Sequence, residues 1–217
     1  MGNLLLGSLT EDVQQRLNDI GTRVPLDKSA VLVKAGASQK HVYFPFNGLV
    51  SLQTMTPGGR SVEVAMLGRE GAAGLPLTGG AAAACTVIVT VCGEALRLSA
   101  DALQAEFDRH PALQRAMIRH WTRMMGEIAD GSACHLFHSP RQRLARWLLA
   151  ASGRIQSSRI ELTQEQLGVI LGMDRTRVTI ASVTLQNAGA ISARYGRIRI
   201  VDRARLQNAS CECRSES

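Results

Sequence analysis

The segment from residue 162 to residue 181 constrains the fold most, because it has the pattern of two short helices joined by a tight turn. Thr163 stands where the N-cap of the first helix belongs, and Glu165 and Gln166 occupy the positions of its first-turn partners. The apolar residues that follow share one face at helical spacing: Leu167, Ile170 and Leu171. This pattern predicts a short helix with one buried face.

A turn and a second helix are expected next. Gly168 leaves room for a close helix crossing, and Gly172 suits the left-handed conformation that ends a helix. Asp174 can cap the second helix, in which Val178 and Ala181 turn inward. The side chains left on the outer face are Arg175, Thr176, Arg177 and Thr179. This layout is typical of a helix-turn-helix, whose second helix enters the DNA major groove. A helical hairpin with a solvated arginine face is the alternative.

The segment after the second helix favours DNA binding. Residues 191–193 and 198–201 alternate like strands, and the sequence Arg-Tyr-Gly at 194–196 makes the turn between them. We therefore predict a β-wing beside the recognition helix. Its arginines would lie near a phosphate backbone: Arg194, Arg197 and Arg199.

The positive charge of the chain is concentrated in its last third. Residues 139–217 contain 13 Arg and 6 Asp or Glu, a net charge of +7, whereas residues 1–138 have a net charge of zero. Every basic residue of the last third is arginine, which suits bidentate contacts to phosphate and guanine. A basic patch can also meet a membrane or an acidic protein, but those partners give no reason for a helix-turn-helix with a wing.

The 217-residue chain is long enough for one large or two small domains with a core. With 4 Phe and 2 Tyr, that core is expected to be aliphatic. The apolar run at residues 4–6 is too short for a signal peptide, and residues 81–92 are too short to span a bilayer as a helix. Five irregularly spaced cysteines do not suggest a disulfide framework, so we expect a cytoplasmic protein.

The first half of the chain has a sequence pattern typical of β-strands. An amphipathic helix is expected at residues 10–20, with Thr10 as its cap. Short β runs broken by glycines follow over residues 23–98. The candidate strands are 31–33, 42–44, 49–52, 62–64, 86–91 and 95–98. Residues 57–60, Pro-Gly-Gly-Arg, form a strong hairpin turn. Many short strands with frequent turns predict an antiparallel β-barrel or jelly roll.

A helical sequence pattern begins at Ser99, and a long helix is expected over residues 111–135. Its apolar residues repeat at spacings of 4, 4, 3 and 4, like a coiled-coil seam: Leu113, Met117, Trp121, Met124 and Ile128. We expect this stripe to form a dimer interface, because helix-turn-helix proteins usually read two half-sites as two-fold dimers. Packing on the protomer's own barrel is the alternative. Ser139 and Pro140 end this helix, and the next is expected over residues 141–151.

These elements predict an α+β chain in three parts: a β-barrel or jelly roll at residues 1–110, a dimerisation helix at 111–138 and a winged helix-turn-helix at 139–217. This order and length resemble the Crp/Fnr family of bacterial transcription regulators. The resemblance is strongest at residues 162–200, and looser at residues 42–50 and at the turn over residues 68–74. It implies a homodimeric sensor whose barrel binds a small effector and whose winged domain binds an imperfect palindrome.

The resemblance also suggests DNA contacts. The family's recognition helix commonly presents an arginine followed by a glutamate, with a second arginine further on. Here Arg175 fills the first place, Thr176 stands at the glutamate place and Ile180 at the later arginine place, so the operator is expected to differ from the best-known consensus. Arg175 is the leading base reader, and Thr176 and Thr179 are candidates for a base or a thymine methyl. The other candidate contacts, several of them to phosphates, are Thr163, Gln164, Asp174, Arg177, Arg194 and Arg197.

The sequence does not identify the effector. Cyclic-nucleotide-binding members of the family carry a glutamate for the ribose and an arginine for the phosphate after the barrel's glycine turn. Residues 71–93 contain no Asp, Glu, Lys or Arg, so cyclic AMP in the usual mode is not expected. Arg69 and Glu70, just before this uncharged segment, keep an anion site open. The candidate pocket residues are Arg69, Glu70, Gly74 and Leu75.

Metal sites are not expected. An N-terminal iron–sulfur cluster is not expected, because the first cysteine is Cys85. Cys134 and His138 are spaced i, i+4 and can share a metal, but incidental polar residues at a helix end, including His135, are the simpler interpretation. The near-terminal cysteines are too close in sequence and too near the terminus to indicate a site: Cys211 and Cys213.

The sequence contains no Gly-x-Ser-x-Gly elbow, P-loop, zinc-protease motif or dinucleotide fingerprint, so an enzyme is not expected. An effector-binding or scaffold protein whose winged domain contacts protein is the alternative to a DNA-binding regulator. The expected partners are double-stranded DNA and a second copy of the chain, with RNA polymerase as a further candidate and no membrane. Activation or repression depends on where the operator lies relative to a promoter.

Overall fold

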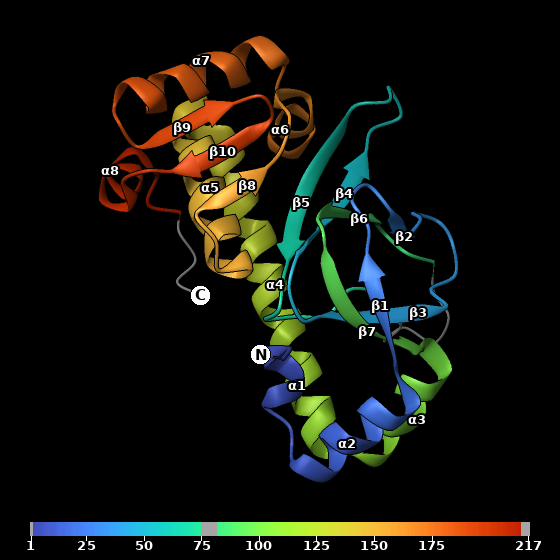
Figure 1. Ribbon diagram of the computed structural model, residues 1–217. Coiled ribbons are helices and arrows are strands. Elements are labelled where there is room, and N and C mark those ends of the chain that lie inside the picture. Colours follow the sequence, from blue (N-terminus) through green and yellow to red (C-terminus); the bar gives the residue numbers. More distant parts are fainter. Residues whose placement is uncertain (1, 75–81, 214–217) are drawn as a thin grey trace. The chain divides into compact units, whose positions relative to one another are not determined.

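The computed structural model describes residues 2–74 and 82–213 (Figure 1). The chain divides into two compact units. Unit 1 comprises Met1–Thr54 and Met66–Met125, and unit 2 comprises Met55–Ala65 and Gly126–Ser217. The candidate pocket residue Leu75 lies outside the described residues, as do residues 76–81 of the uncharged segment.

Two sheets of antiparallel strands form the β-rich part of the chain (Figure 1). The three-stranded sheet has the order β1-β7-β3, and the four-stranded sheet has the order β2-β6-β4-β5. In chain order the strands are β1 (Thr22–Leu26), β2 (Val31–Val33), β3 (His41–Pro45), β4 (Leu49–Met55), β5 (Ser61–Leu67), β6 (Thr86–Val91) and β7 (Gly93–Ser99). The predicted barrel or jelly-roll class is confirmed.

Every candidate strand of the sequence is present, and most are longer than predicted. The predicted hairpin turn joins β4 to β5, where the Thr56 amide donates to the Arg60 carbonyl at 2.8 Å and Gly59 has a φ of +79°. Strand β1 was not predicted, because Pro25 interrupts its β pattern. Pro25 is tolerated because β1 is an edge strand, paired only with β7.

The core of unit 1 is mainly aliphatic, as the composition predicts. Residues of four helices join the sheet residues in one buried cluster: α1 (Leu4–Gly7), α2 (Glu11–Ile20), α3 (Ala100–Arg109) and the start of α4 (Pro111–Phe137). Leu17 of α2, Phe44 of β3 and Leu103 of α3 are each at most 1% exposed. The side chain of Ser99 caps α3 by accepting from the amide of Ala102, so the predicted helix start is confirmed.

Helix α4 (Pro111–Phe137) is the predicted long helix, and it ends two residues later than expected. Its apolar stripe does not face one way. Leu113 and Met117 are fully buried in the core of unit 1 and cannot present a surface to a second copy, so the dimer-interface prediction is corrected for these two residues. Met124 is also buried, whereas Ile128 is half-buried and Trp121 is 43% exposed.

A different apolar stripe is exposed on α4. Ile118, Trp121 and Met125 are 56%, 43% and 50% exposed. Their spacings of 3 and 4 residues place them on one face of the helix. This exposed stripe shares only Trp121 with the predicted seam, and it offers α4 an apolar face for a partner.

Unit 2 contains the winged helix-turn-helix (Figure 1). Helix α5 (Pro140–Ile155) opens with a capping box between Ser139 and Gln142 and contacts α7 and α8. The remaining elements are β8 (Arg159–Glu161), α6 (Gln164–Leu171), α7 (Arg175–Asn187), β9 (Ile191–Arg194), β10 (Arg197–Ile200) and α8 (Arg203–Ala209). No helix among the described residues is long and apolar enough to cross a membrane.

Candidate nucleic-acid interface

The first helix of the motif, α6, begins as the sequence predicts. The Thr163 hydroxyl accepts from the Gln166 amide at 3.1 Å, and the Gln166 side chain accepts from the Thr163 amide at 3.0 Å. This reciprocal capping box satisfies two amides that the helix itself leaves unpaired. Because the box fixes where α6 starts, it also fixes the position of Gln164 in the first turn.

The turn between the two helices depends on two glycines. Gly172 has a φ of +58° and ends α6 in the left-handed conformation, as predicted. A Cβ on Gly168 would lie 2.9 Å from the Met173 carbonyl oxygen, so the small residue is required by the turn that folds back over it. The Arg143 guanidinium on α5 donates to the Leu171 carbonyl, which neutralises the C-terminal end of α6.

The recognition helix α7 has an inner and an outer face. Val178, Ala181 and Leu185 are buried on the inner face. The Asp174 side chain caps the helix by accepting from the Arg177 amide at 2.9 Å, and it also lies 3.3 Å from Nε of Arg177. Asp174 is therefore engaged within the protein, and its ion pair partly offsets the charge that Arg177 offers to a phosphate.

The outer face of α7 begins with Arg175 and Thr176, which are both exposed. The Thr179 hydroxyl lies 2.9 Å from Oε1 of Gln164, and also 2.9 Å from the Arg175 carbonyl. The contact with Gln164 joins the two helices of the motif. Thr179 is thus half-buried and structural as well as adjacent to the exposed face.

Sequence reasoning assigned no DNA contact to two apolar residues of the same face. Ile180 is 62% exposed and Val183 is 45% exposed. Their positions in the sequence indicate this exposure, because they lie one turn apart and between the inward-facing residues of α7. Exposed aliphatic side chains on a recognition helix suit the C5-methyl group of thymine.

The predicted wing is present, with one additional strand. Strand β10 pairs with β9 on one side and with β8 on the other. Tyr195 and Gly196 make the turn with φ values of +50° and +72°, and the Tyr195 side chain is fully exposed at the tip. Strand β8 was not predicted, because its three residues are too short to show a period.

The wing arginines lie on the outer side of this sheet. Ile198 and Ile200 of β10 are buried, whereas Arg194, Arg197 and Arg199 are exposed. Arg197 is not an isolated cation, because its Nε lies 3.3 Å from Oε1 of Glu161 on β8. The alternation places the arginines at the surface, as predicted.

An open groove of about 430 Å³ lies between the wing and the helices of the motif. Its polar lining includes Thr163, Gln164, Arg175, Arg194 and Arg197. The groove therefore brings together five of the nine residues that the sequence assigned to DNA contact. The other four lie outside its lining, on the cap and outer face of α7: Asp174, Thr176, Arg177 and Thr179.

The candidate effector residues lie in the turn after β5. The Glu70 carboxylate accepts from the Gly68 amide at 3.0 Å, and the Glu70 carbonyl accepts from Arg123 at 2.7 Å. Gly74 has a φ of +79°, and a Cβ there would lie 2.6 Å from the His41 carbonyl oxygen. These contacts hold the turn in place, and a ligand role for Arg69 and Glu70 stays a prediction.

His120 of α4 supports the same turn. Its Nε2 lies 3.1 Å from the Ala72 carbonyl oxygen, and Nη2 of Arg123 lies 3.4 Å from its Nδ1. The Ala72 amide also donates to Nε2 at 3.3 Å, so Ala72 contacts this nitrogen with both its amide and its carbonyl. A Cβ on Gly71 would lie 2.4 Å from the imidazole. The ring is 3% exposed, and this burial lowers the pKa of His120 below its usual value of 6.5.

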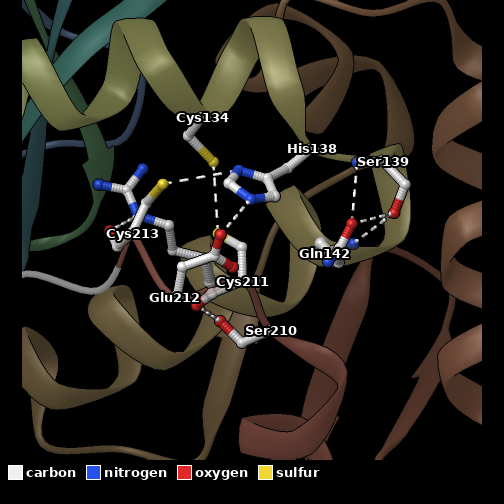
Figure 2. A network of polar contacts seen from close by, with 9 residues as sticks. Cys134, His138, Ser139, Gln142, Ser210, Cys211, Glu212 and Cys213 are labelled. Atoms are coloured by element: carbon white, nitrogen blue, oxygen red, sulfur yellow. Dashed lines mark hydrogen bonds and ion pairs between the residues drawn. The ribbon is translucent and has the colours of Figure 1, made fainter.

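A second group of reactive side chains lies elsewhere in unit 2. Cys134 and His138, at the end of α4, lie beside Cys211 and Cys213, which follow α8 (Figure 2). Sequence reasoning considered the two pairs separately, since 77 residues separate Cys134 from Cys211. His135 is exposed and is not part of the group.

Comparisons with known proteins match both units. A model of the cyclic nucleotide-binding domain matches residues 23–110, and a model of the Crp-like helix-turn-helix domain matches residues 142–209. The fold is similar to that of FixK2 from Bradyrhizobium japonicum, with a TM-score of 0.76 at 17% identity over 88% of this chain and 98% of that one. The chain belongs to the Crp/Fnr family of transcription regulators.

Other Crp/Fnr structures share the fold of this regulator. TTHB099, a CRP-family regulator from Thermus thermophilus, has a TM-score of 0.74 at 19% identity. The match covers 90% of this chain and 100% of the TTHB099 chain. The c-di-GMP responsive regulator CLP from Xanthomonas campestris has a TM-score of 0.73 at 15% identity. The match covers 89% of this chain and 100% of the CLP chain. A search of curated proteins gave no match. The family consists of transcription regulators and not of enzymes.

Proposed function

We propose that this Crp/Fnr protein binds double-stranded DNA sequence-specifically as a homodimer, under the control of an effector. In this proposal residues 139–217 bind DNA, residues 111–138 dimerise and residues 1–110 sense the effector. The observation that carries it is the exposed polar face of α7, which lies beside the exposed arginines of the wing across one open groove. A helix of this kind fits the major groove, while a wing reaches the adjacent backbone.

Charge supports the choice of DNA as the partner. Residues 139–217 carry a net charge of +7, and all of their basic residues are arginines. Arginine contacts phosphates and guanine in a bidentate manner, which gives both affinity and base discrimination. A winged domain that contacted only protein would not require this concentration of charge.

The proposed base readers lie at the start of α7. Arg175 is assigned to a guanine, because it is exposed and its side chain has no acidic partner among the ion pairs of the described residues. Thr176 and Ile180 are assigned to neighbouring bases, with Ile180 suited to a thymine methyl. Arg177, Arg194 and Arg197 are assigned to phosphates, since all three are exposed at the start of α7 or on the wing.

Dimerisation is assigned to the exposed stripe of α4. Ile118, Trp121 and Met125 lie on one face of the helix, and exposed apolar side chains at 3,4 spacing are typical of helix–helix contact. A two-fold contact along α4 would present two recognition helices to one duplex. Operators are therefore expected to be palindromic, with half-sites about 34 Å apart, which is one DNA turn.

The effector is expected to be apolar or neutral, because the segment after the glycine turn brings no cation for a phosphate. The protein is proposed to act in the cytoplasm, where its five cysteines stay reduced. RNA polymerase is proposed as a further partner. The direction of regulation would follow from operator position.

Selection from a pool of random duplexes tests this proposal. The full-length protein is expected to enrich sequences with two related half-sites one helical turn apart. Failure to enrich any sequence, together with binding that does not change with salt concentration, would contradict it. That result would favour a scaffold role in which the winged domain contacts protein.

A further inference from the structure

Four metal-binding side chains meet where the chain after α8 passes the end of α4 (Figure 2). They are Cys134 at the end of α4, His138 immediately after that helix, and Cys211 and Cys213 in the segment after α8. Their candidate ligand atoms all lie within 4.8 Å of one another. We propose that these three cysteines and one histidine bind a zinc ion, as a structural site that ties the C-terminal segment to α4.

Two of the distances between ligand atoms are close to those of a tetrahedral zinc site. Sγ of Cys134 lies 3.5 Å from Sγ of Cys211, and Sγ of Cys213 lies 3.5 Å from Nδ1 of His138. With Zn–S bonds of about 2.3 Å and Zn–N bonds of about 2.0–2.1 Å, tetrahedral geometry places two sulfurs about 3.8 Å apart and a sulfur about 3.6 Å from a nitrogen. These two contacts therefore need to lengthen by only a few tenths of an ångström to accept the ion.

The backbone explains why the four side chains converge. The His138 amide donates to the Cys134 carbonyl at 3.2 Å, so helical spacing extends one residue beyond α4 and places both side chains on the same side. Cys211 and Cys213 lie on either side of a bend at Glu212, and the ligand atoms of both reach the end of α4. Nε of Arg146 on α5 donates to the Cys213 carbonyl at 2.7 Å and holds this segment in place.

The histidine has the outer partner that zinc-binding histidines usually have. Nε2 of His138 lies 3.1 Å from Oε1 of Glu212, while Nδ1 faces the sulfur of Cys213. A carboxylate on the far nitrogen fixes the tautomer that leaves Nδ1 free to bind a metal. Glu212 is largely exposed, so this contact can be removed with little effect on packing.

The composition of the site indicates zinc and a structural role. Three thiolates and one imidazole are the donor set of Cys₃His structural sites, and a site closed by four protein ligands has no position for a substrate. Binding is balanced as one Zn²⁺ entering and three thiol protons leaving, which gives the site a net charge of −1. The guanidinium of Arg146 lies beside it and offsets this charge.

The test uses the full-length protein in a reducing buffer, with metal removed and then returned as Zn²⁺ or Co²⁺. We expect one ion per chain, release of about three protons, and the thiolate charge-transfer and visible bands of tetrahedral Co²⁺. Cys211→Ser and Cys213→Ser should lose these bands. The double variant Cys85→Ser/Cys92→Ser is the matched control and should keep them, because both of its cysteines lie outside the group.

The variant Glu212→Gln separates an effect on zinc binding from an effect on folding. This exposed substitution should leave the circular dichroism spectrum unchanged and weaken zinc binding by about 10–100-fold. Zinc that fails to bind, or bands that persist in Cys211→Ser, would overturn the proposal. A Cys134–Cys211 disulfide, found by mass spectrometry after rapid alkylation of the protein in cells, would also overturn it.

Discussion

Nε of Arg197 on β10 lies 3.3 Å from Oε1 of Glu161 on β8, so an acidic residue neutralises one of the wing arginines that we assign to DNA phosphates. Both side chains are largely exposed, with relative accessibilities of 79% and 67%. An exposed pair of this kind contributes little to stability. Its main effect is expected on DNA affinity, because Glu161 both orients Arg197 and competes with phosphate for it.

Substitutions of this pair should therefore act on DNA binding in opposite directions. Arg197→Ala should weaken binding to all duplexes about equally and lower the salt slope by about one unit. Glu161→Gln should strengthen binding to all duplexes, since it removes a negative charge next to the backbone. Fluorescence anisotropy over a series of salt concentrations measures both. Unchanged affinity in both variants would place the wing away from the DNA.

Trp121→Glu should convert the proposed dimer to a monomer and abolish operator binding. The substitution places two carboxylates opposite each other in the exposed apolar stripe of α4. Light scattering measures the assembly state. Arg119→Glu is the control, because this exposed residue lies on another face of α4 and should leave the dimer intact. A stable Trp121→Glu dimer would move the interface elsewhere. Met124 is unsuitable for this test, since it is buried within the protomer.

Unit 1 should lose stability as the pH falls below the usual pKa of histidine. The pKa of buried His120 is lowered, so between pH 6.5 and its folded pKa the unfolded chain binds a proton that the folded chain does not. The free energy of unfolding should fall by up to about 1.4 kcal/mol per pH unit in this window. Urea denaturation at pH 7.5 and pH 5.5 measures it. His120→Gln should show a smaller difference, and an unchanged difference would contradict this account.

Cyclic AMP and cyclic GMP are expected to give no micromolar binding by titration calorimetry, and neither should strengthen operator binding. The reason is the lack of a cation over residues 71–93 to neutralise a buried phosphate. A clear micromolar isotherm that is abolished by Arg69→Ala would contradict this prediction. It would show that the phosphate is held by a residue that precedes the uncharged segment 71–93.

The helix-turn-helix was predictable because local rules determine it. The capping box of Thr163 and Gln166, the left-handed Gly172 and the cap at Asp174 each depend on residues within four positions. Strands with regular alternation were predictable for the same reason. Strand β1 was missed, because Pro25 hides a strand whose edge position only the sheet reveals.

Longer-range features were not predictable from spacing alone. The periodicity of α4 indicated apolar faces, but it did not reveal that Leu113 and Met117 belong to the protomer's core while Ile118 and Met125 are exposed. The cysteine–histidine group requires the segment after α8 to meet the end of α4 across 77 residues of sequence. Local sequence patterns do not predict contacts between residues this far apart in the chain.

The most direct test of the central claim is the affinity of the full-length protein for its selected operator, measured over a series of salt concentrations for wild type and Arg175→Ala. We expect log affinity of the wild type to fall linearly with log salt concentration, as counterions are released from neutralised phosphates. Arg175→Ala should cost about 1–3 kcal/mol on the operator and relax preference at one position in each half-site. Salt-independent binding, or an Arg175→Ala variant with wild-type affinity and specificity, would contradict the claim that α7 reads DNA.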